Sequence, residues 1–240
     1  MGKKYLPSYK RAENPPPMRL TSRDVRIVLE VYEQRILSAP QIEALFFPSP
    51  KPRGCITSCQ TRLQLLFHHG FLDRIDLPIK LGEGRAPYVY ALDERGANLV
   101  ATKKDVDRAD VTWNSKHNKL GHQFVEHTLA VNDFQIAIRL LSDEGHFKVK
   151  SWIGESDFRT AALKESVPYR MRGARVVRNY PDGYFRLSIP GYKSDAHFFL
   201  EVDQGTMSNA RWREKVEAYI EFRTRRSVSY THLTLPTITE

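Results

Sequence analysis

Three carboxylates near one apolar segment constrain this chain most. Residues 198–203 read Phe-Phe-Leu-Glu-Val-Asp, and nineteen residues before Glu201 lies Pro181-Asp182-Gly183. Because side chains alternate along a strand, we expect Glu201 and Asp203 on one face of a strand, with Asp182 on an adjacent turn. Three such oxygen ligands suit Mg²⁺ or Mn²⁺, the ions of phosphodiester chemistry. The pattern therefore predicts a sheet whose strand ends bring acids together.

The overall charge points to a polyanionic partner. The formal net charge is +9 and the pI is about 9.5. Such a basic balance favours nucleic acid. The sequence has no apolar run long enough for a membrane helix, and its first residues lack the apolar core of a signal peptide. We therefore expect a cytoplasmic protein with no membrane contact.

The N-terminal half shows the apolar spacing of three short helices. They are expected at residues 25–36, from Ser38 onward, and at 56–69. Thr21 or Ser22 can cap the first, and Ser38 with Gln41 forms a capping box for the second. Gly70 ends the third.

Two short strands and a further helix follow these three helices. The strands are expected at residues 71–75 and 88–92, joined by a wing loop that contains 82–85, and the helix at 93–100. This order resembles a winged helix-turn-helix, which implies duplex DNA binding with the third helix in the major groove. Some winged helices bind proteins instead, and that alternative stays open. The side chains suited to contact DNA are Thr57, Ser58, Gln60, Thr61, Arg62 and Gln64, with Arg85 in the wing.

The C-terminal half predicts a long helix, three main strands and a last helix. The helix spans residues 117–142, and its expected buried stripe is Leu120, Phe124, Val131, Phe134, Ile138 and Leu141. The strands are expected at 147–153, 181–187 and 197–203, with a basic segment between the first two that holds Arg170, Arg172, Arg175 and Arg178. The last helix starts near Ser208. Its expected inward residues are Trp212, Val216, Tyr219 and Ile220, and Arg211 and Lys215 are expected on its other faces.

This order of elements, with acids at a strand end, resembles the PD-(D/E)XK nuclease fold. Those enzymes carry a lysine two residues after the second acid, and this chain has Asp203 there. Lys215 is a candidate replacement for that lysine. The candidate catalytic residues are Asp182, Glu201, Asp203 and Lys215, and the candidate Mg²⁺ or Mn²⁺ ligands are Asp182, Glu201, Asp203 and Glu126. Each acid also has a plain alternative, as a turn residue or a solvent-facing side chain.

The combination of both halves is similar to the replication-relaxation family of plasmids and other mobile elements. The resemblance rests on residues 127–132, Pro181-Asp182-Gly183, the run 199–206, and Lys215 with Tyr219. It covers roughly residues 20–226. It implies a role in plasmid replication and DNA relaxation, and it leaves the chemistry open.

The fold class expected from these patterns is mixed α/β (α+β), a winged helix-turn-helix followed by a nuclease-like domain. The expected boundaries are a flexible basic arm at 1–17, the winged helix at 18–102, a linker at 103–116, the nuclease-like domain at 117–227, and a tail at 228–240. The tail back-translates to a sequencing adapter, so we expect a metagenomic fragment whose native C-terminus is missing.

Three functions fit the sequence. The first is a DNA-binding protein of a mobile element, with double-stranded DNA as partner. The second is a metal-dependent DNA nicking or cleaving enzyme. The third is a non-catalytic adaptor that recruits a relaxase or a replication initiator.

Overall fold

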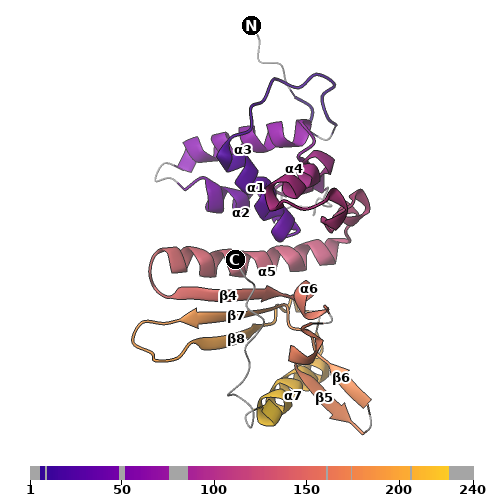
Figure 1. Cartoon of the computed structure of the whole chain (residues 1–240), viewed down its shortest axis with the longest axis vertical. Helices are drawn as coiled ribbons and strands as arrows, with labels where there is room; N and C mark the ends of the chain where they lie inside the picture. Colours follow the sequence, from indigo (N-terminus) through magenta and orange to yellow (C-terminus); the bar gives the residue numbers. More distant parts are fainter. Residues whose placement is uncertain are drawn as a thin grey trace. The chain divides into compact units, whose positions relative to one another are not determined.

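The computed structural model describes residues 6–8, 10–48, 52–75, 86–160, 162–173, 175–205 and 207–226 (Figure 1). The expected wing loop at 82–85, with Arg85, and the expected adapter tail lie outside these residues. The chain forms two compact units, Met1–Leu140 and Leu141–Glu240. Both combine helices with small antiparallel sheets, which confirms the expected mixed α/β class. Among the described residues, none of the helices combines the length and apolarity needed to cross a membrane.

The first unit follows the order helix, strand, helix, helix, strand, strand, helix. Its elements are α1 (Ser22–Glu33), β1 (Ile36–Ser38), α2 (Ala39–Phe46), α3 (Pro52–His68), β2 (Leu72–Ile75), β3 (Val89–Leu92) and α4 (Glu94–Lys104). Short 3₁₀ helices at Arg108–Asp110 and Ser115–Asn118 lead to α5 (His122–Asp143). The three strands form an antiparallel sheet in the order β1-β3-β2.

Side-chain caps set where the first two helices begin. Thr21 caps α1 in a capping box with Asp24, and the Gln41 backbone N–H donates to Ser38 Oγ at 3.3 Å in the box that starts α2. The Ser38–Gln41 box is the one the sequence predicts. These contacts satisfy backbone N–H groups that have no partner within the helix.

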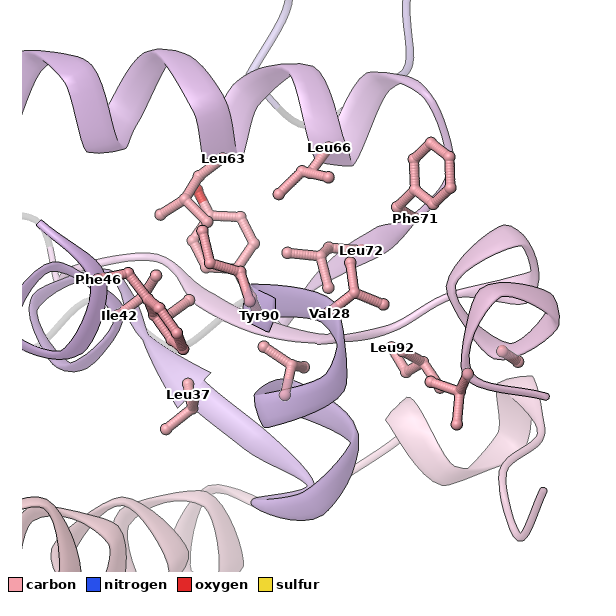
Figure 2. Close-up of a cluster of buried hydrophobic side chains, with 14 of the residues drawn as sticks. Val28, Leu37, Ile42, Phe46, Leu63, Leu66, Phe71, Leu72, Tyr90 and Leu92 are labelled. Atoms are coloured by element: carbon pink, nitrogen blue, oxygen red, sulfur yellow. The ribbon is translucent and has the colours of Figure 1, made fainter. Parts of the chain in front are cut away.

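The main core of the first unit lies between α1, α2, α3 and one face of the sheet (Figure 2). Leu37, Tyr90 and Leu92 of the strands belong to the same buried cluster as Leu63 and Leu66 of α3. Because strand side chains alternate, the opposite face of the sheet is a separate apolar surface. There Ile36, Ile75, Val89 and Ala91 form a second buried cluster with Val125 of α5. β3 is therefore buried on both faces.

The long helix α5 buries a different stripe from the one the sequence predicts. Its buried residues are Val125, Asn132 and Ile136, whereas Phe124 and Leu141 are exposed. Asn132 Nδ2 donates to the backbone oxygen of Ile36 at 2.7 Å. The stripe prediction was wrong because apolar residues occur on several sides of this helix. A buried asparagine then selects the face, since its amide needs hydrogen-bond partners.

The expected linker at residues 103–116 contributes to the core. Val111 is buried in the main cluster, and Trp113 packs against it. The division between the two units falls inside α5, after Leu140. Both observations place the boundary between the two units later in the chain than the sequence predicts. The expected linker is polar except for a few apolar residues, and two of these, Val111 and Trp113, pack into the core of the first unit.

The N-terminal segment is held against α3, in contrast to the flexible arm expected. Arg11 Nε donates to the Phe67 oxygen at 2.9 Å, and the Ala12 N–H donates to His68 Nδ1 at 3.1 Å. Arg74 Nη1 donates to the Ser8 oxygen at 2.5 Å. A guanidinium stabilises the carbonyl end of a helix, which explains why a basic segment binds there.

The second unit contains two antiparallel sheets and a long helix. Its elements are β4 (Lys148–Gly154), α6 (Glu155–Phe158), a 3₁₀ helix (Lys164–Ser166), β5 (Tyr169–Arg172), β6 (Arg175–Arg178), β7 (Gly183–Ser188), β8 (Ala196–Leu200) and α7 (Asn209–Arg226). One sheet has the order β4-β7-β8 and the other pairs β5 with β6. The last strand ends at Leu200, three residues before its expected end.

A row of aromatic rings crosses the larger sheet of the second unit. The Phe185 ring stacks on Trp152 at 5.5 Å and on Phe198 at 5.0 Å, measured between ring centroids. Gly183 begins β7 beside this row, and a Cβ there would lie 3.0 Å from the Trp152 ring. The glycine of Pro181-Asp182-Gly183 therefore leaves room for the indole, in addition to forming a turn.

Candidate functional site

The outer side of α3 is the first candidate site. Thr57, Ser58, Gln60 and Thr61 are exposed, and Gln64 is half-buried. Cys59, Leu63 and Leu66 point into the core. The structure therefore brings five of the predicted DNA-contacting residues to the solvent side of a single helix. Their role in DNA binding stays a prediction.

Arg62, the sixth predicted contact on α3, has an internal partner. Its Nε donates to Asp24 Oδ1 at 3.0 Å, and its Nη2 forms an ion pair with the same carboxylate. The side chain of Asp24 is fully buried. Burial alone would raise the pKa of Asp24, but hydrogen bonds from Arg62 and Thr21 outweigh burial and lower it. Arg62 therefore links α3 to the cap of α1.

Further arginines near α3 were not among the sequence-based candidates. Arg19 and Arg23 are exposed, and the Arg19 backbone oxygen accepts from Arg62 Nη2 at 3.2 Å. The Arg23 guanidinium lies 4.7 Å from the centroid of Phe47, and that of Arg26 lies 5.4 Å from Phe46. The available signal was the spacing of Arg23 and Arg26 on the polar side of α1, with Arg19 just before the helix. These residues add positive charge beside α2 and α3.

The second candidate site lies where β8 ends and α7 begins. The Asp182 N–H donates to the Leu200 oxygen at 3.0 Å, and Asp182 Oδ2 accepts from the Val202 N–H at 2.7 Å. Asp182 therefore extends the pairing of β7 and β8 beyond the last strand residue. This contact fixes the chain that carries Glu201.

Glu201 is the centre of a polar network. One oxygen, Oε2, forms an ion pair with Lys215 Nζ. The other, Oε1, accepts from the Tyr219 hydroxyl at 2.6 Å and from Asn179 Nδ2 at 3.2 Å. The side chains of Glu201 and Lys215 are only 10% and 17% exposed. Burial and the neighbouring Glu201 carboxylate raise the pKa of Tyr219, so its hydroxyl keeps its proton.

Lys215 faces Glu201, whereas the sequence placed it on another side of α7 than Tyr219. Residues 212, 215 and 219 follow i, i+3, i+7 spacing and share one side of the helix. Trp212 Nε1 donates to Asp203 Oδ2 at 3.0 Å on this side. The sequence placed Trp212 on the same side as Tyr219, but its other expected inward residues, Val216 and Ile220, are 48% and 61% exposed. The helical spacing gave no indication of Asn179.

Asp203 does not continue the strand geometry from which its role was inferred. It lies three residues beyond β8, where side chains no longer alternate, and Oδ1 accepts from the Gly205 N–H at 3.1 Å. Glu126 lies on α5 in the first unit, where His122 Nε2 is 3.1 Å from its carboxylate. Across the described residues, no three His, Cys, Asp or Glu side chains gather as a metal-binding group.

The molecule is thus a mixed α/β protein of two units, one built around a three-helix core and the other around an acid–lysine–tyrosine network. The chain belongs to the replication-relaxation family, whose model matches residues 30–235. This confirms the family expected from the sequence and points to a role in the replication or relaxation of plasmid or other mobile-element DNA. The match extends into the expected adapter tail, whose origin stays a prediction. Neither the search of curated proteins nor the search of solved structures gave a match.

Proposed function

We propose that the protein binds double-stranded DNA of a plasmid or other mobile element through the first unit, which acts as a winged helix-turn-helix. The order α1-β1-α2-α3-β2-β3 supports this reading, because it is the order of that domain class. In such domains the third helix enters the major groove. Here the third helix is α3.

The outer face of α3 carries the proposal. The helix spans Pro52–His68, a 17-residue segment without a single Asp or Glu. Its exposed side chains, Gln60 and Thr61 among them, offer hydrogen bonds suited to base edges and phosphates. An acid-free helix surface also avoids repulsion from the DNA backbone. The exposed Arg19 and Arg23 add attraction beside it.

Binding to a mixed duplex library over a salt series tests the proposal. Affinity should fall steeply with salt, because phosphate contacts release counterions. The double variant Gln60→Ala, Thr61→Ala should bind more weakly and fold as stably as the unsubstituted chain. Gln123→Ala with Thr102→Ala removes the same two side-chain types from exposed positions on α5 and α4 and should have no effect. If the unsubstituted chain does not bind DNA even at low salt, the proposal is refuted and the non-catalytic adaptor becomes the preferred function.

A cleaving enzyme is a second candidate, favoured by one observation. Lys215 lies beside the candidate catalytic acid Glu201. A lysine in that position could stabilise the negative charge that develops on a phosphate during attack. The donor set argues against a divalent ion in this arrangement. Both oxygens of Glu201 already accept from Lys215, Tyr219 or Asn179, and Asp203 is engaged by Trp212. We therefore derive no metal-dependent step.

The two candidates differ in a plasmid assay. A cleaving enzyme should nick supercoiled plasmid in the presence of Mn²⁺, and Glu201→Gln should abolish the nicking. A DNA-binding protein without this activity should leave the plasmid supercoiled while retarding it in a gel. Nicking that depends on Glu201 would establish the enzyme.

A further inference from the structure

The β5–β6 hairpin is a basic ribbon that none of the functions above uses. Residues 169–178 contain four arginines and no acid. The two strands pair antiparallel over four residues each, from Tyr169↔Arg178 to Arg172↔Arg175. In Figure 1 the ribbon lies beside α7 in the second unit.

Acidic residues of α7 hold β5 and its two arginines. Arg172 Nη2 lies 2.9 Å from Glu214, and Arg170 forms an ion pair with Glu217. The Met171 N–H donates to Glu221 at 3.4 Å. Three carboxylates therefore bind one edge of the ribbon. This leaves β6 as the outer strand.

The outer strand keeps its positive charge. Arg175 and Arg178 are exposed, and within the described part of the chain no acidic partner contacts either of them. On this strand, Val176 is 41% exposed and pairs across the ribbon with Met171, which is 36% exposed. Because strand side chains alternate, this apolar pair shares one face of the ribbon with Arg178, and Arg175 lies on the opposite face.

We propose that the β5–β6 ribbon is a second contact for duplex DNA, with the Met171–Val176 pair against the groove, Arg178 of the same face on one phosphate, and Arg175 reaching another phosphate from the opposite face. The inference rests on the proposed DNA-binding function and adds a second surface to it. Charge complementarity selects the partner, because arginines without acids suit a polyanion. The shape also fits, because the major groove is about 12 Å wide and admits a two-stranded ribbon.

The test compares full-length variants in a DNA-binding salt series. Arg175→Ala with Arg178→Ala should lower affinity at least roughly tenfold and reduce the log–log salt slope by about 1.8, that is about 0.9 for each lost phosphate contact. Lys103→Ala with Lys116→Ala removes the same charge from exposed positions of the first unit and should leave the slope nearly unchanged. Equal effects of both pairs would reduce the result to net charge and overturn the proposal.

A third variant separates the apolar contact from the charges. Met171→Thr with Val176→Thr places β-branched threonines, which suit strands, at both exposed positions, so folding should be preserved. It should weaken binding severalfold with an unchanged salt slope, because apolar contacts release no counterions. If the unsubstituted chain binds DNA and both ribbon variants bind equally well, the second contact is refuted and the proposed function stands. No binding by the unsubstituted chain refutes both.

Discussion

Arg62 and Asp24 form a buried ion pair that ties the middle of α3 to the first turn of α1. The carboxylate is fully buried, and the guanidinium is 26% exposed. Thr21 completes the arrangement, because its N–H donates to Asp24 Oδ2 at 2.7 Å. The residue with the most obvious DNA-binding chemistry on α3 is therefore needed for the position of α3 itself.

Arg62→Ala is expected to destabilise the first unit. Removing one partner of a buried pair leaves an uncompensated charge, so the free energy of unfolding should fall by about 3 kcal/mol. Urea denaturation measures it. Adding Asp24→Asn should recover part of the loss, since the buried charge is then gone. A stable Arg62→Ala variant with weak DNA binding would restore Arg62 as a direct contact.

Stability should decrease as the pH falls below about 6.5, the ordinary pKa of histidine. His68 is buried, and burial together with Arg74, Arg11 and His69 lowers its pKa. The unfolded chain therefore takes up the proton before the folded one, so acid favours unfolding until the pH passes the lowered value.

Protonation of His68 would also remove the acceptor used by the Ala12 N–H. His68→Gln keeps a polar side chain and should flatten the pH dependence of the unfolding free energy between neutral and mildly acidic pH. An unchanged slope in this variant would assign the pH dependence to other groups.

Lys215→Ala should unfold the second unit more easily, because the nearly buried Glu201 carboxylate would lose its ion-pair partner. The expected loss is about 3 kcal/mol, and Glu201→Gln in the same chain should offset part of it. Arg211→Ala, at an exposed position of the same helix, is the matched control. A Lys215→Ala variant of full stability that loses plasmid nicking would assign the lysine to catalysis.

Gly96→Ala should be strongly destabilising although the change is a single methyl group. A Cβ on Gly96 would lie 2.1 Å from the Phe71 backbone oxygen and 2.8 Å from Leu92 Cδ1. Backbone cannot move aside as a flexible side chain can, so we expect a loss of about 3 kcal/mol in thermal unfolding. Gly121→Ala meets no atom within 4 Å and serves as the control. Equal melting temperatures would contradict the close packing of α4 on Phe71.

Local signals in the sequence predicted much of the first unit. The Ser38–Gln41 cap and the stop at Gly70 need only neighbouring residues, and both occur as expected, with Gly70 at φ +71°. The partners of Glu201 depend instead on contacts between distant segments. Asn179 precedes Glu201 in the sequence, and Lys215 follows it in the next helix. No local pattern indicates which face of that helix will contact the end of a strand.

The candidate acids show the same limit. Alternation along a strand was the reason to expect Glu201 and Asp203 on one face, but β8 ends at Leu200, so strand geometry does not decide where either side chain points. Where β8 ends depends on its pairing with β7, and beyond Leu200 that pairing is replaced by the Asp182 side chain, which accepts from the Val202 N–H. The order of residues indicates that acids follow an apolar strand, but it does not indicate which neighbours each carboxylate contacts.

The packing of α5 on the first sheet affects how this protein can fold during synthesis. Ile36, Val89 and Ala91 are covered only when Val125 and Leu129 are present. A growing chain folds from its N-terminus, but here α5 must be released after the last strand of this sheet, β3, before the sheet is covered on both sides. Until then an apolar sheet face stays open to other chains, so a chain that ends before α5 should aggregate more readily than one that includes it.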